Sequence, residues 1–299
     1  MRGFLLAVVM IGAVSTAQAA DMPDLSVLRG SVPPSLSSAT RNWDGWYAGG
    51  QVGYTSSSMD FSQTVVGLTN FIFRNSVLQQ PTSAWSLLNK NSPQGTGFGA
   101  FAGRNYQYDD LVFGFEANYV YLNKLASSST SSISLGIVNP PGSSPPPNHT
   151  YTYETSLTGT AALQIKDVVT LRGRAGWATG NFLPYLFGGV AVGRMDVSRS
   201  VTTNVVLRDD ATETVTDQFG NTTTINLPPV FSNIPSLSQS DSEERTNSFV
   251  AGWTAGLGME YMLWGNVFMR GEWEYIKFLS VKNTSVSMNS LHAGIGYKF

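Results

Sequence analysis

Apolar and polar residues alternate with a period of two along much of the chain from Trp43 to Phe299. Near the C-terminal end, Leu291 and Ile295 share one side of an extended chain, whereas Ser290 and His292 share the other. Side chains of a β-strand point to opposite faces in turn, so this pattern predicts strands with one apolar face and one polar face. The candidate strands are residues 45–54, 95–107, 111–121, 169–177, 183–197, 249–261, 267–275 and 290–299.

The connections between these segments differ in length. Three connections are as short as hairpin turns: residues 108–110, 178–182 and 262–266. Others are long and rich in Ser, Thr and Asn, namely residues 55–94, 126–164 and 198–245, while residues 279–287 form a shorter connection. Alternation continues through residues 151–165, which predicts strands that run on beyond a bilayer, and residues 83–90 are a candidate short helix.

Short turns at one end and long loops at the other are typical of a bacterial outer-membrane barrel. We therefore predict an all-β fold, an eight-stranded antiparallel transmembrane β-barrel with short periplasmic turns and long extracellular loops. Its outward face is the apolar one, with Val169, Trp253, Leu291 and Ile295 among its members.

Composition excludes several other classes of protein. Charged residues make up 13% of the 299 residues, about half the usual share of a soluble domain. No run approaches the roughly 20 apolar residues of a membrane-spanning helix. Net charge is −2, which offers no basic surface for nucleic acid. The chain has no cysteine, which excludes disulfides, thiolate metal sites and cysteine nucleophiles. A soluble all-β protein or a membrane β-barrel remains.

The N-terminal segment resembles an export signal. Arg2 precedes an apolar run at residues 4–14, and small residues follow. This pattern predicts a signal peptide at residues 1–19, cleaved between Ala19 and Ala20. Residues 20–42 contain prolines and lack a sustained period, so we expect a flexible periplasmic arm, followed by the barrel at residues 43–299.

Charged residues on the polar strand faces form a balanced set of acids and bases. The interior of an eight-stranded barrel is just wide enough for side chains to fill it, and unpaired charge there is costly. We therefore predict an ion-pair network that plugs the lumen; a narrow conductive path gated by the same pairs is the alternative. The predicted network consists of Glu116, Arg172, Arg174, Arg194, Asp196, Glu260, Arg270, Glu272, Glu274 and Lys298. Arg194 and Asp196 share their parity with Val190 and Val192, and the face of Arg104 is open.

Five segments together resemble a known family: Trp43–Gly50, Gly103–Tyr108, Leu171–Trp177, Leu183–Tyr185 and Ala293–Phe299. They are similar to the small eight-stranded outer-membrane barrels of Gram-negative bacteria, the porin-family or opacity-protein-like surface antigens. The resemblance implies a monomeric barrel in the cell outer membrane, in contact with outer-membrane lipids and lipopolysaccharide. It also implies that Phe299 is the signal read by the barrel-assembly machinery, in addition to any place in an interfacial aromatic belt.

Candidate chemistry is sparse. His149 lies in a proline-rich segment, and His292 has Ser290, Glu272 and Glu274 within reach on the polar faces. A hydrogen-bonded lumen histidine is the simpler interpretation of His292, and a lipid-A enzyme is the alternative. We expect no enzyme activity, cofactor, metal or nucleic-acid partner. The predicted role is a structural surface protein with a plugged lumen; the alternatives are small porin-like transport of solutes or ions, and adhesion or ligand binding (hemin, for example) through the extracellular loops.

Overall fold

The computed structural model describes residues 41–83 and 85–299. The predicted signal peptide at residues 1–19, with its Ala19–Ala20 cleavage site, lies outside the described residues. So does the predicted arm at residues 20–42, apart from its last two residues.

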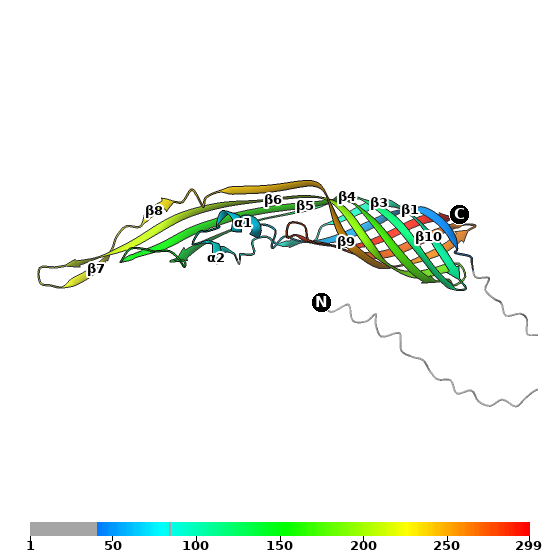
Figure 1. Ribbon diagram of the computed structural model, residues 1–299, viewed down its shortest axis with the longest axis horizontal. Coiled ribbons are helices and arrows are strands. Elements are labelled where there is room, and N and C mark those ends of the chain that lie inside the picture. The colour runs from blue at the N-terminus through cyan, green and yellow to red at the C-terminus, as the bar shows by residue number, and fades with distance from the viewer. Residues whose placement is uncertain (1–40, 84) are drawn as a thin grey trace, which may run out of the picture. The chain divides into compact units, whose positions relative to one another are not determined.

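Eight strands form a closed antiparallel barrel (Figure 1). They are β1 (Gly45–Asp60), β3 (Gln94–Tyr108), β4 (Leu111–Val138), β5 (His149–Trp177), β6 (Phe182–Thr216), β9 (Ser240–Trp264), β10 (Val267–Phe278) and β11 (Ser285–Lys298). Each strand pairs with the next one in this order, and β11 pairs back with β1. The predicted fold class is confirmed.

Smaller elements lie in the connections. The strands are β2 (Lys90–Asn91), which pairs with β1, and β7 (Thr222–Asn226) and β8 (Val230–Asn233), which pair with β6. The helices are α1 (Val66–Ile72) and α2 (Gln79–Thr82), so the helix predicted at residues 83–90 was misplaced. Neither helix in this described part of the chain is long and apolar enough to cross a membrane.

The two strand faces separate as the alternation predicted. Leu291 is 61% exposed and Trp253 is 50% exposed on the outer face of the barrel, whereas Glu272 and Arg174 are buried inside. The prediction of an apolar outer wall and a polar interior is confirmed.

The long connections consist largely of strand. Pairing of β4 with β5 continues to Val138 and Thr152, and pairing of β5 with β6 continues to His149 and Ala211. Figure 1 shows β5 and β6 running on beyond the barrel, with α1 and α2 beside them. The predicted continuation of strand through residues 151–165 is confirmed.

Irregular pairing marks the level at which these extensions begin. The register shifts between Tyr121 and Leu125 on β4, where it pairs with β5, and between Ile165 and Asp167 on β5, where it pairs with β6. An extra residue in one strand turns the following side chains to the other face. Odd-numbered residues of β5 are therefore exposed at Val169 but buried at Leu163 and Ile165.

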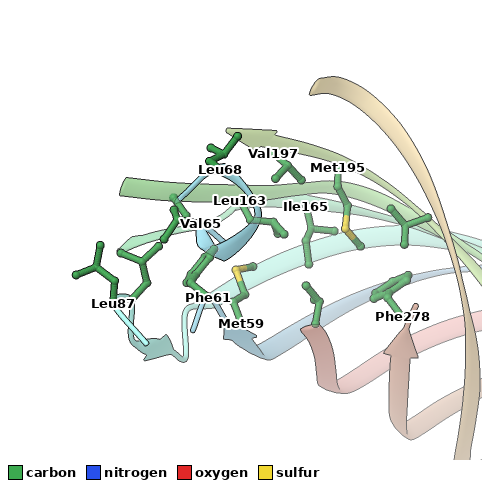
Figure 2. Packing of buried hydrophobic residues seen from close by; sticks show 14 of the residues in the cluster. Met59, Phe61, Val65, Leu68, Leu87, Leu163, Ile165, Met195, Val197 and Phe278 are labelled. Atoms are coloured by element: carbon green, nitrogen blue, oxygen red, sulfur yellow. The ribbon is translucent and has the colours of Figure 1, made fainter. Parts of the chain in front are cut away.

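This change of face gives the extensions an apolar core of their own. Figure 2 shows Met59 and Phe61, at the end of β1, packed with Leu163 of β5 and Val197 of β6. Leu68 of α1 belongs to the same cluster. Apolar residues that face outward in the barrel wall thus give way to apolar residues that face inward.

Candidate functional site

Charged side chains from four strands meet in the middle of the lumen. Because inward-pointing residues recur at every second position of a strand, neighbouring strands bring them to the same level. This lumen cluster consists of Glu116 on β4, Arg172 and Arg174 on β5, Glu260 on β9, and Arg270, Glu272 and Glu274 on β10, all of them buried.

Glu116 lies at the centre of the lumen cluster. Its Oε1 accepts hydrogen bonds from Arg172 Nη2 at 2.5 Å and Arg270 Nη1 at 3.1 Å. Its Oε2 accepts one from the Tyr47 hydroxyl at 2.7 Å and one from Arg174 Nη1 at 3.4 Å. One carboxylate is thus shared by three guanidinium groups.

The other carboxylates surround this centre. Glu260 accepts two hydrogen bonds from Arg174, both 2.8 Å long, in the bidentate geometry that makes such pairs strong. Glu272 accepts hydrogen bonds from Arg172 at 2.6 Å and from the Tyr185 hydroxyl at 2.5 Å.

Glu274 is the least paired carboxylate of the cluster. Its Oε1 accepts a hydrogen bond from Thr254 at 2.8 Å and lies 3.5 Å from Arg172 Nη1. Three guanidinium groups therefore face four carboxylates, and Glu274 is at the edge of the network rather than at its centre.

An aromatic layer lies between the lumen cluster and the short-turn end of the barrel. Its apolar cluster consists of Trp43, Tyr47, Phe101, Val112, Ala178, Leu183, Tyr185, Phe187, Met262 and Phe268. Arg270 stacks on Phe101 with its guanidinium carbon 3.7 Å from the ring centre, and Arg172 stacks on Phe187 at 4.0 Å. These contacts add cation–π attraction where water is excluded.

Glycine makes room for the aromatic rings of this layer. A Cβ atom at Gly258 would lie 2.5 Å from the Tyr185 ring, and one at Gly296 would overlap the Phe268 ring. The glycines on the inner faces of β9 and β11 thus allow rings from neighbouring strands to cross the lumen.

On its other side the lumen cluster borders a small polar cavity and then the apolar core. The cavity has a volume of about 10 Å³ and is lined in part by Thr55, Asn118, Ser290 and His292, which is room for about one water molecule. Val120, Val168, Ile276 and Met288 close it towards the extensions.

Ser290, His292 and Glu274 line the same small cavity, but the described contacts include no hydrogen bond among them. Ser290 Oγ lies 2.9 Å from Thr55 Oγ1, and His292 Nδ1 lies 3.1 Å from Gln51 Nε2. A nucleophile needs direct contact with its base, and both side chains are buried. His149 instead pairs with Asp209 on β6, with Nδ1 2.9 Å from Oδ1.

Arg194 and Asp196 lie outside the lumen, contrary to expectation. They occupy the outward face of β6 together with Val192, so the period of two decides their orientation rather than their charge. Arg194 pairs with Asp167, and Asp196 pairs with Lys166 at 2.8 Å, at the level where the register shifts.

Lys298 does not join the lumen cluster either. Its Nζ donates to the backbone carbonyl oxygens of Asn42 at 2.8 Å and Asp44 at 2.9 Å. Phe268 pairs with Gly296, between the level of Lys298 and that of Arg270, so the aromatic layer separates the two basic groups.

Two tyrosines also belong to the network, although the sequence pattern had not assigned them to it. The hydroxyl groups of Tyr47 and Tyr185 donate to Glu116 and Glu272. The alternation of the strands could have indicated that both side chains point into the lumen. Tyr47 lies on the same strand face as Gln51, and Tyr185 lies on the same face as Phe187.

Arg104 and Phe299 have defined places on the barrel. Arg104, whose face the sequence left open, lies half-buried on the outer wall beside Trp46. The backbone N–H of Phe299 donates to the carbonyl oxygen of Trp46 at 2.8 Å, and its ring packs against Tyr297. An assembly signal at Phe299 stays a prediction.

Part of this chain is similar in sequence to a described outer-membrane protein. The 25 kDa outer-membrane immunogenic protein of Brucella ovis is 23% identical over 201 residues, which cover 67% of this chain and 62% of that protein. The chain thus spans less than two thirds of that relative's length.

Solved structures with similar chains include Neisserial surface protein A and Ail, the attachment invasion locus protein of Yersinia pestis. The first is 15% identical with a TM-score of 0.35 and covers 85% of this chain and 97% of its own. The second is 10% identical with a TM-score of 0.30 and covers 85% of this chain and 99% of its own.

A family model described as the outer membrane protein beta-barrel domain matches residues 4–299. Because this match spans nearly the whole sequence, the chain belongs to the outer membrane protein beta-barrel family, and its barrel lies in the cell outer membrane.

Proposed function

We propose that this protein is a structural surface protein of the outer membrane whose lumen is closed to solutes and ions. The observation that carries the proposal is the sequence of three side-chain layers along the lumen. Aromatic rings lie at the periplasmic end, the lumen cluster follows, and apolar residues lie at the extracellular end.

Each layer opposes conduction for a different physical reason. An ion that enters the aromatic or apolar layer loses its hydration without gaining polar partners. The lumen cluster offers ligands, but its carboxylates are already bound to Arg172, Arg174 and Arg270. The cavity beside it holds about one water molecule and is no continuous path.

Single-channel recording on the purified full-length chain in planar bilayers tests the proposal. We expect no discrete current steps from the wild-type protein. The triple variant Glu116→Ala, Arg172→Ala, Arg270→Ala removes the centre of the network but keeps the aromatic and apolar layers, so it should stay silent as well. A porin of known conductance in the same bilayer shows that an open barrel would be detected. Steps of uniform size from the wild-type protein would instead support porin-like transport.

A second candidate function is binding at the extracellular surface, as an adhesin or as a receptor for a ligand such as hemin. Large apolar side chains are exposed on β8 and in the turn between β6 and β7, including Phe219 at 80%, Val230 at 61% and Phe231 at 57%. Apolar groups that stay exposed in water often mark interaction sites. The variant Phe219→Ser, Val230→Ser, Phe231→Ser should bind less hemin or host matrix than the wild-type protein if this surface is used. Equal binding by both proteins would reject the surface.

A further inference from the structure

The outer wall of the barrel carries an arginine where lipid would be expected. Arg104 lies on β3, and Trp46 and Phe115 are its pairing partners on β1 and β4. Its guanidinium carbon lies 5.5 Å from the Trp46 ring centre and 4.9 Å from that of Tyr106. These outward-facing aromatic rings hold the guanidinium group against the wall.

This guanidinium group has no acidic partner among residues 41–83 and 85–299. Its Nε atom is buried and makes no hydrogen bond there. Two other basic residues at the outer wall do have acidic partners, since Arg194 contacts Asp167 and Lys166 contacts Asp196. An unpaired charge on the lipid face is costly, so an anion from beyond these described residues would stabilise Arg104.

The position of Arg104 indicates which leaflet supplies that anion. It lies close to the short turn at residues 109–110, which joins β3 to β4 on the periplasmic side. At about 3.3 Å per residue on a strand tilted by roughly 40°, the distance to the turn is on the order of 10 Å. The long arginine side chain can therefore reach the headgroup layer of the periplasmic leaflet.

A groove on the wall continues from this arginine. It has a volume of about 590 Å³ and is lined by Trp46, Ala102, Phe115, Ala117, Leu171 and Gly173, among others. The small residues leave space between the large ones. Trp46 and Phe115, whose ring centres are 5.9 Å apart, belong both to the groove and to the surroundings of Arg104. The Arg104 guanidinium group and the apolar groove are thus adjacent on the wall.

We propose that Arg104 binds the phosphate of a phospholipid of the periplasmic leaflet and that one acyl chain of this lipid lies in the groove. The guanidinium fork donates charge-assisted hydrogen bonds to the phosphate oxygens. The Trp46 and Tyr106 rings hold the fork in place. The site takes a diacyl phospholipid, because phosphate and chain are recognised side by side.

Two variants separate the two halves of the site. Arg104→Gln removes the charge but keeps a polar side chain. Gly173→Phe fills the groove, and it is tolerated because a Cβ atom there would lie no closer than 4.0 Å to Gly188 O. The matched controls are Arg194→Gln, on the other rim of the wall, and Gly271→Phe, where a Cβ atom has the same 4.0 Å clearance from Met259.

Native mass spectrometry of the folded full-length chain in detergent, titrated with dipalmitoyl phosphatidylglycerol, measures the binding. We expect one saturable lipid adduct on the wild-type protein and on both controls. Its affinity should fall roughly tenfold or more in Arg104→Gln, because charge-assisted hydrogen bonds are lost. Gly173→Phe should also lose the adduct. Gel mobility before and after boiling confirms that each variant is folded.

Three results would overturn the proposal. They are the absence of a saturable adduct on the wild-type protein, unchanged affinity in Arg104→Gln, and an equal loss in the two controls. Glycerophosphoglycerol, which carries the headgroup without acyl chains, tests the groove. If it binds as tightly as the lipid, the site is a phosphate site and the groove has no part in it. If it binds far more weakly, the assignment of the acyl chain stands.

Discussion

Replacing Arg270 with methionine removes one guanidinium group from the lumen cluster and keeps a side chain of similar length. The Arg270 side chain is fully buried and contacts Glu116, Glu260 and Glu272. The variant leaves four carboxylates with only two guanidinium partners. Breaking a buried pair by removing one partner costs about 3–5 kcal/mol. The unfolding equilibrium constant should therefore rise roughly a hundredfold to several thousandfold.

Urea titration in phospholipid vesicles, followed by tryptophan fluorescence and gel mobility, measures this free energy of unfolding. The control is Arg208→Met, which breaks the exposed pair with Asp210, whose N–O distance is 2.8 Å. Such surface pairs contribute about 0–1 kcal/mol. The second substitution in Arg270→Met, Glu272→Gln restores the wild-type excess of one carboxylate and should regain part of the loss. If Arg270→Met destabilises no more than Arg208→Met, water solvates the cluster, and the reasoning for a closed lumen fails.

Three other predictions follow from other parts of the molecule. Gly258→Leu forces the Tyr185 ring out of the lumen, because its Cβ atom would lie 2.5 Å from that ring, and should destabilise the barrel by roughly 1–3 kcal/mol in the same titration. Replacing residues 212–227 by a short Gly-Ser turn should leave the heat-modifiable gel mobility unchanged, because this tip is exposed. Hydrogen bonds from Lys282 and Arg199 lower the pKa of the Glu243 carboxyl to about 2. A lowered pKa stabilises the folded chain above pH 4.5, so amide protection of the turn at residues 279–284 should fall as the pH decreases from 4.5 to about 2.

Each of these predictions has its own control. Gly188→Ala places a Cβ atom on the outer face, 3.6 Å from the nearest atom, and should change stability by less than about 0.5 kcal/mol. Loss of the folded gel band on removal of residues 212–227 would mean that the tip is needed for assembly. Glu243→Gln should abolish the acid-dependent change, and a carboxyl that titrates near pH 4.5 by NMR would contradict the pairing.

The period of two was sufficient to predict the barrel and the centre of its lumen. Glu116, Arg172 and Arg270 lie on strands whose inward and outward residues differ clearly in polarity, so their faces could be read directly. Arg194 shows that a charged residue type does not by itself indicate an inward position. It lies on the same strand face as Val192, and that face points outward. A charge is accepted there since Asp167 neutralises it.

The irregular pairing of β5 could not be predicted in the same way. The odd-numbered residues are mostly apolar on both sides of Lys166, so the sequence reads as one unbroken pattern. The face changes because an unpaired residue is inserted relative to β6, which depends on the neighbouring strand. The hydrogen bonds of Ser290 and His292 likewise depend on Thr55 and Gln51, far away in the sequence.

The inserted residue on β5 also fixes how deeply the barrel is immersed. On one side of it, Val169 and Leu171 are exposed on the outer wall; on the other side, Ile165 and Leu163 are buried in the apolar core of the extensions. If the barrel moved towards the periplasm, the Asp167–Arg194 pair would enter the hydrocarbon layer. If it moved outward, Val169 would be exposed to water. The backbone of β5 therefore encodes the boundary between the lipid-facing wall and the part of the chain that extends beyond it.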